Sequence, residues 1–371
     1  MPFGTGAARA APAPACSPAQ QQTAPSVTTD QSGYLTSLQP QAAWALTRGA
    51  GVTVALLDTG VASPLSGTVL SGRLLDGGNH AGDSATSGLL DCDGRGTSDA
   101  GLIAGHDGSK RLPGIAPDAT ILSVRIQAGG DTPPPPARVA AGIDEAVSRG
   151  AKVIVVAAPC ADSSALKASV QRAIRAGTAI VAAVGDDPSA KSSYPAQYDN
   201  VIGVSVLPAS GGSNQVQGKF VDVVAPGTNL AGMSVNGQKY RLGYSGSSAA
   251  AALVGGTVAL MRAASGAIPV ATIVSRLEYS ADHPAAALPS PTEGWGTVNP
   301  YAALALPASM TAPPSPAAGP RINAVKLAAP DQPGHRFAGA YLGIGLIGAA
   351  LAAGAALAGV RRARRRRWET A

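Results

Sequence analysis

The stretch "ARVAAGIDEAVSRGAKVIVVAAP", residues 137–159, decides the fold class because it joins a helix pattern directly to a strand pattern. Its first part is rich in alanine, is long enough for a crossover helix and ends at Gly150, a residue type that commonly follows a helix. Its second part, residues 151–159, is a short apolar run that ends in small residues, which is typical of a strand buried on both faces. A helix followed at once by such a strand is the repeating unit of a parallel sheet.

The same pattern continues on both sides of this stretch. The segment "SSALKASVQRAIRAG", residues 163–177, predicts a second helix that ends at glycine. Four further apolar runs predict buried strands at residues 51–58, 121–126, 178–185 and 200–207. Alternating strands and helices predict an α/β fold, a parallel sheet with helices on both faces. In that architecture functional side chains are expected at the carboxyl ends of the strands.

Length and charge narrow the class of protein. With 371 residues and 45% hydrophobic content, the chain can bury one large core or two modest ones, which excludes disorder throughout. The arginine-rich residues 361–371 carry +5 of the formal net charge of +6, so the body has about +1. We therefore expect no nucleic-acid partner.

The chain contains three cysteines, Cys16, Cys92 and Cys160. None of them lies in a C-x-x-C pair, so we expect no metal site, and we expect no cofactor. The odd number leaves two alternatives: one disulfide with one free thiol in an oxidising compartment, or three buried free thiols.

The C-terminal part predicts a membrane anchor. Residues 337–360 form a run of 24 residues without a charge, which as a helix would span about 36 Å. The basic tail, residues 361–371, is expected on the cytoplasmic side, so the main domain is expected outside the membrane. Small residues at four-residue spacing in the span favour a transmembrane helix partner, although chance composition gives the same spacing. Residues 306–336 are rich in proline and predict a semi-extended linker.

The predicted orientation requires an export signal. Residues 1–37 read as a polar N-terminal extension before the domain at residues 38–305, and residues 1–26 contain no apolar run long enough for a signal. Residues 8–15, "ARAAPAPA", look like the end of a signal peptide. Two alternatives follow: the true start lies upstream, or the protein is tail-anchored without a signal.

Two residues are the first candidates for chemistry. Asp58 ends the strand at residues 51–58 and is followed by Thr59-Gly60, a tight turn at the edge where a site is expected. Ser248 stands at the start of a long run of small residues, so its hydroxyl could lie at the positive end of a helix and act as a nucleophile. Each signal is weak alone, since serine is also a common helix cap.

The order of the motifs along the chain is a more specific signal than either residue alone. D-T-G, G-R-G-T, A-V-G, V-D-V-V-A-P-G and G-x-S follow one another along the chain. In this order the chain resembles the subtilisin-like serine proteases, and more narrowly the mycosins, membrane-anchored proteases of actinobacterial type VII secretion. The resemblance runs from about Leu38 to Leu304 and continues through the linker, the span and the tail. It is carried by "AWALTRGAGVTVALLDTGV", "DCDGRGT", "YPAQYDNVIGVSVL", "VDVVAPGTNL" and "GWGTVNPYAAL".

The resemblance implies roles for individual residues. Asp58 matches the catalytic aspartate and Ser248 the nucleophile of the family. Arg95 stands at the position of the catalytic histidine, and Asp186 at that of the oxyanion-hole asparagine. Asp99 stands where a small apolar residue is usual. The resemblance also implies a type VII secretion membrane complex as partner.

The two exchanged residues predict a loss of catalysis. A guanidinium has no acceptor lone pair and stays protonated, so Arg95 cannot take the proton of Ser248. A carboxylate at Asp186 would repel the charge of the transition state. In subtilisin, loss of the histidine costs about 10⁶ in turnover and loss of the oxyanion donor about 10²–10³. We therefore expect a catalytically impaired homologue with a structural or peptide-binding role. The alternative is an active endopeptidase in which Ser248 uses an unorthodox base, such as His80 or His106.

The resemblance leaves Arg95 two arrangements. Arg95 either faces Asp58, within reach of Asp186, or points to solvent and pairs with Asp99 four residues further along a helix.

The resemblance also implies a Cys16–Cys92 disulfide that ties residues 16–38 to the body. Cys160 is then expected to be free, because the loop at residues 186–198 lacks the cysteine that pairs with it in the family.

Overall fold

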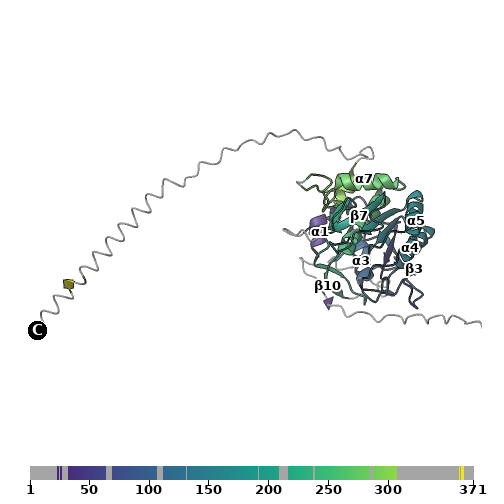
Figure 1. Ribbon diagram of the computed structural model, residues 1–371, viewed down its shortest axis with the longest axis horizontal. Helices are drawn as coiled ribbons and strands as arrows, with labels where there is room; N and C mark the ends of the chain where they lie inside the picture. Colours follow the sequence, from purple (N-terminus) through teal and green to yellow (C-terminus); the bar gives the residue numbers. More distant parts are fainter. Residues whose placement is uncertain are drawn as a thin grey trace, which may run out of the picture. The chain divides into compact units, whose positions relative to one another are not determined.

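The structure is a computed structural model, shown in Figure 1, and it divides into two units, Met1–Ser315 and Pro316–Ala371. The described residues are 23, 24, 26, 32–63, 69–106, 112–130, 132–190, 192–208, 216–236, 239–284, 287–306, 359, 361 and 362. The predicted linker, from residue 307 on, lies outside them, as do the predicted membrane span apart from Gly359 and most of the basic tail.

A seven-stranded sheet forms the centre of the first unit. Its spatial order is β3-β4-β2-β5-β6-β7-β8, and all neighbouring strands run parallel. The predicted α/β fold class is confirmed. The strands are β2 (Thr53–Asp58), β3 (Leu74–Asn79), β4 (Thr120–Arg125), β5 (Val153–Val156), β6 (Ala179–Ala183), β7 (Val201–Val206) and β8 (Val223–Ala225).

Both faces of the sheet are covered by helices, which explains the continuous apolar runs in the sequence. On β2, Val54 and Leu56 point into one core, which contains α3 (Arg95–Ala104) and α6 (Ser247–Ser265). The alternate side chains, Ala55 and Leu57, point into the other core with α4 (Pro136–Ser148) and α5 (Ser164–Arg175). Helices α4 and α5 lie side by side on one flank of the domain in Figure 1.

The two helices predicted from the sequence are confirmed as α4 and α5. The side chain of Ser163 caps α5 by accepting a hydrogen bond from the backbone N–H of Leu166 at 3.1 Å. Gly150 and Gly177 follow the two helices with φ of +76° and +77°, a conformation that glycine adopts without strain. The chain then turns directly into β5 and β6.

Part of the N-terminal extension packs on the domain. Helix α1 (Gly33–Leu38) buries Tyr34 in the core, where its hydroxyl donates to the carbonyl oxygen of Pro113 at 2.7 Å. Strand β1 (Thr23–Ala24) adds to a second, antiparallel sheet of order β1-β10-β9, which the sequence did not predict. The remaining elements are β9 (Leu230–Met233), β10 (Tyr240–Tyr244), α2 (Pro40–Trp44), α7 (Val270–Ser280) and α8 (Pro300–Ala305).

Helix α6 is apolar over nearly its whole length. Among the described residues it is the one helix long and apolar enough to cross a membrane. Its side chains from Ser247 to Arg262 are buried beneath the sheet, so α6 is the central core helix of the domain.

Candidate functional site

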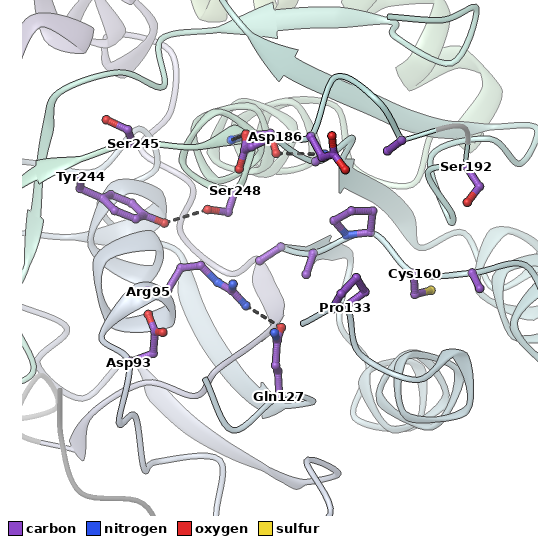
Figure 2. A pocket seen from close by; sticks show the side chains of 18 of the residues that line it. Asp93, Arg95, Gln127, Pro133, Cys160, Asp186, Ser192, Tyr244, Ser245 and Ser248 are labelled. Carbon is purple, nitrogen blue, oxygen red and sulfur yellow. Dashed lines mark hydrogen bonds between the residues drawn. The ribbon is translucent and has the colours of Figure 1, made fainter. Parts of the chain in front are cut away.

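A cleft of about 680 Å³ lies at the carboxyl ends of the parallel strands. Strand order reverses between β2 and β5, and ligands of open α/β sheets bind at such a switch point. Figure 2 shows the side chains that meet there. They include Arg95, Gln127, Asp186, Tyr244 and Ser248.

Arg95 faces Asp58 inside the domain. Its Nε donates to Asp58 Oδ1 at 2.7 Å, and its terminal NH2 donates to Gln127 Oε1 at 2.8 Å. The Asp58 side chain is fully buried, and that of Arg95 is 16% exposed. The pKa of Arg95 is raised: burial is the largest single effect and lowers it, but the charge and hydrogen bond of Asp58, with smaller contributions from Tyr244 and Asp99, together outweigh burial. The buried arrangement at Asp58 is therefore confirmed, and Arg95 remains a cation that cannot accept a proton.

The motif D-C-D-G-R-G-T positions Arg95 through the buried carboxylate of Asp91. Asp91 Oδ1 accepts from the backbone N–H of Gly94, and Oδ2 accepts from that of Thr97, both at 2.8 Å. The hydroxyl of Thr59 donates to Asp91 Oδ1 at 2.9 Å and so links this loop to the D-T-G turn. The start of α3 is thereby fixed against the end of β2.

Gly96 permits the close approach of these two segments. A Cβ at Gly96 would lie 2.0 Å from the carbonyl oxygen of Gly60, so alanine requires a backbone shift. We expect Gly96→Ala to lower the free energy of unfolding by about 2–3 kcal/mol, measured by urea denaturation. Gly33→Ala is the control, because a Cβ at Gly33 meets no atom within 4 Å. Equal stability of the two variants would contradict this account.

Ser248 is the second residue of α6, and its side chain is buried at the cleft. Its Oγ lies 2.9 Å from the hydroxyl oxygen of Tyr244, the interaction drawn in Figure 2. Tyr244 in turn donates to Asp99 Oδ1 at 2.6 Å. Ser248 is thus hydrogen-bonded to a phenol, which is a far weaker base than the imidazole of a serine protease.

No histidine among the described residues lines the cleft. His80 follows β3, which β4 separates from β2, and His106 follows α3 with its Nδ1 at 3.0 Å from a terminal nitrogen of Arg48. His283 follows α7 and is hydrogen-bonded to the main-chain carbonyl of Trp295. His335 lies outside the described residues. A histidine that substitutes for Arg95 is therefore absent from the described part of the chain.

Asp186 lies between the end of β6 and the start of α6. Its Oδ1 accepts from the backbone N–H of Ser247 at 2.7 Å, and the Ser247 hydroxyl accepts from the N–H of Gly185 at 3.1 Å. A carboxylate is favourable at the positive end of a helix, so the hydrogen bond from the Ser247 N–H to Asp186 stabilises the start of α6. The same carboxylate cannot donate a hydrogen bond to an oxyanion beside Ser248.

The cysteines differ in state. Cys92 is disulfide-bonded, whereas Cys160 is a buried free thiol in the cleft wall. Burial raises the pKa of Cys160 to about 12, so its reactive thiolate is disfavoured. Cys16 lies outside the described residues, and its pairing with Cys92 stays a prediction. Within the described ranges no group of three His, Cys, Asp or Glu side chains could hold a metal ion.

Sequence reasoning missed three features of the site. Tyr244 and Gln127 were not identified, and Asp99 was noted only as an unusual residue at a small apolar position and as the partner of Arg95 in the solvent-exposed alternative. In the structure Asp99 is fully buried and bonded to Tyr244, so the exposed pair was wrong. The spacing of four residues between Tyr244 and Ser248 is the one signal the sequence carries for their contact.

The parallel sheet and the chain order of the residues around the cleft define the class of protein. Asp58 after the first core strand, Arg95 at the start of α3, Asp186 after β6 and Ser248 at the start of α6 form the framework of a subtilisin-like serine-protease domain.

Comparison with known proteins agrees with this class. The family model described as "Subtilase family" matches residues 49–296, more than half of the chain. The chain therefore belongs to the subtilase family.

The relatives of this chain include mycosins. Mycosin-3 of Mycobacterium tuberculosis is 30% identical over 375 residues, which cover 82% of this chain and 79% of that protein. The structure of the MycP3 protease from the type VII (ESX-3) secretion system is similar with a TM-score of 0.64 and 28% identity, over 83% of this chain and 100% of that one. A chain of an intact ESX-5 inner membrane complex has a TM-score of 0.68 and 27% identity, over 94% and 95%. The chain is a mycosin-like subtilase.

Proposed function

We propose that this protein is a component of a type VII secretion membrane complex whose protease centre is catalytically impaired. One observation carries the impairment: Arg95, at the position of the base, is bound to buried Asp58. Association with the secretion complex is supported by the similarity to MycP3 and to the chain of the ESX-5 inner membrane complex, which spans 94% of this sequence.

The chemistry of the cleft supports impairment at each step of peptide hydrolysis. Ser248 would have to lose a proton, but its partner Tyr244 is a phenol whose pKa is raised well above its ordinary value, first by burial and then by the charge of Asp99. The oxyanion would form beside Asp186, which offers a carboxylate and no N–H. The alternative of an active endopeptidase with an unorthodox base would require Ser248 to react despite both features.

The proposed topology follows the sequence. An extension at residues 1–37 precedes the domain at 38–305; a linker at 306–336 leads to a single membrane span at 337–360 and a cytoplasmic tail at 361–371. The domain would contact the complex on the extracytoplasmic side, and the span would pack against a partner helix. The disulfide at Cys92 supports an oxidising compartment.

A peptide-binding role is the second candidate, and the shape of the cleft favours it. Impairment has left a formed cleft of about 680 Å³ with an apolar wall at residues 157–161. A peptide could lie there uncut. Its retention would depend on wall residues and not on Ser248.

Substitution of Ser248 tests the proposed function. We expect wild type and Ser248→Ala to hydrolyse a peptide substrate at the same rate within about twofold, where a working triad would lose about 10⁶. Neither protein should be labelled by a fluorophosphonate probe, with a working subtilisin as positive control. In a deletion strain, both should restore type VII secretion equally. Labelling of the wild type that Ser248→Ala abolishes would overturn the proposal.

A further inference from the structure

A buried chain of polar side chains leads away from Ser248. Ser248 Oγ lies 2.9 Å from the hydroxyl oxygen of Tyr244, and Tyr244 donates to Asp99 Oδ1 at 2.6 Å. Tyr244 is 3% exposed and Asp99 is fully buried, so water does not compete for these bonds. Ser248 and Tyr244 lie on the consecutive elements α6 and β10, and the bond to Asp99 joins them to α3, which is far away in the sequence.

The direction of each hydrogen bond follows from the donors available. Tyr244 has one hydroxyl proton, which it gives to the carboxyl oxygen of Asp99. Its oxygen is then an acceptor, so the hydroxyl of Ser248 must donate to it. The Ser248 proton is therefore directed at a neutral phenol oxygen, a very weak base.

Asp99 continues the chain to Asp58. Asp58 Oδ2 and Asp99 Oδ2 are both buried without a hydrogen-bond partner, although the opposite oxygens are bonded to Arg95 and Tyr244. The pKa of Asp99 is raised well above its ordinary value, mainly by burial and then by the charge of Asp58, and a contact with the Asp58 carboxyl group that becomes a hydrogen bond only when one of the two groups is protonated adds to the rise. One proton shared between the two carboxyl groups satisfies both orphaned oxygens. Arg95 then balances the single remaining negative charge.

We propose that Asp99 and Tyr244 are positioning residues of a proton-sharing network that holds Ser248 inactive independently of Arg95. The inference rests on the proposed function and extends it. A histidine at position 95 would have to take the Ser248 proton from Tyr244, and it would need Asp58 as its orienting acceptor while Asp58 is engaged with Asp99. Reversion of Arg95 and Asp186 alone therefore leaves the Ser248 hydroxyl hydrogen-bonded to Tyr244 and unreactive.

Graded reversion tests the network. The double variant carries Arg95→His with Asp186→Asn; one triple variant adds Asp99→Ala, and the other adds Tyr244→Phe. We expect each folded triple variant to exceed the double variant at least tenfold in kcat/KM for a peptide substrate, with a pH profile that has an inflection at a histidine pKa. Tyr240→Phe added to the double variant is the control on the same strand, outside the cleft lining, and should not raise the rate.

The outcomes separate the two proposals. If neither triple variant exceeds the double variant, whether all hydrolyse or none does, the role of Asp99 and Tyr244 is overturned and the proposed function stands. If the unreverted chain is itself labelled at Ser248, the proposed function falls.

The shared proton has a readout independent of activity. Because the pKa of Asp99 is raised in the folded state, the stability this group contributes is full below its unfolded pKa and is lost as pH rises through the folded pKa. The Asp99→Asn variant carries no such proton. Between pH 5 and pH 8 we therefore expect the melting temperature of the variant to fall less than that of the wild type, with a difference between the two falls of at least about 3 °C. Asp58, Arg95 and Tyr244 face Asp99 in both proteins. An equal fall in both would overturn the shared proton. The other acids with a raised pKa cancel in the comparison, namely Asp91, Asp222 and Glu278.

Discussion

Replacing Arg95 by methionine is expected to lower the free energy of unfolding by about 3–5 kcal/mol. Arg95 is the cation bound to the fully buried carboxylate of Asp58, and methionine fills similar volume without charge. Its loss leaves the carboxylate of Asp58 in a dry interior beside Asp99, a second acid. The same substitution removes the donor to Gln127 Oε1, a side chain of the cleft lining whose Nε2 donates to the carbonyl oxygen of Gly130. Chemical denaturation followed by circular dichroism measures the change.

A double-mutant cycle separates the ion pair from packing. Asp58→Asn combined with Arg95→Met removes both charges, so we expect it to be more stable than Arg95→Met alone. Arg48→Met is the matched surface control, because the Arg48–Asp118 pair is 34% and 38% exposed and such pairs contribute at most about 1 kcal/mol. A loss at Arg95 no larger than at Arg48 would show that the buried pair does not stabilise the domain.

The fold could be predicted from the sequence because its signals are local. Each central strand is buried on both faces, so the apolar runs at residues 53–58 and 153–156 stand out against the polar loops. The antiparallel sheet of β1, β10 and β9 was missed for the opposite reason. Strand β10, "YRLGY", is only partly buried and contains Gly243 with φ of +65°, so it shows no clear alternation.

The candidate site was predictable to the extent that each residue acts through its own position in a motif. Arg95 and Asp186 were identified because the chemistry they replace is fixed at those places. Asp99 was not, because an aspartate one helical turn from an arginine is normally exposed, and only the fold brings Tyr244, 145 residues away, onto it. A contact between distant segments leaves no periodic signal in one sequence.

Loss of the disulfide at Cys92 is the second large effect we expect. Cys92→Ala should lower the free energy of unfolding by about 2–5 kcal/mol, because the unfolded chain gains the freedom that the link removes. If the partner is Cys16, as the family resemblance implies, the closed loop has about 75 residues and the entropic contribution is about 4.5 kcal/mol. Cys92 also lies beside Asp91, so a looser loop would displace the start of α3 and Arg95 with it.

Reductant distinguishes this effect from packing. The melting temperature of the wild type should fall on reduction, and that of Cys92→Ala should not change. Cys160→Ala is the control: its thiol is buried and free, so this variant should respond to reductant as the wild type does. Insensitivity of the wild type, or retained sensitivity in Cys92→Ala, would contradict the prediction. Since cytosolic reductants keep thiols reduced, a reductant-sensitive protein isolated directly from cells would also support a domain outside the cytoplasm.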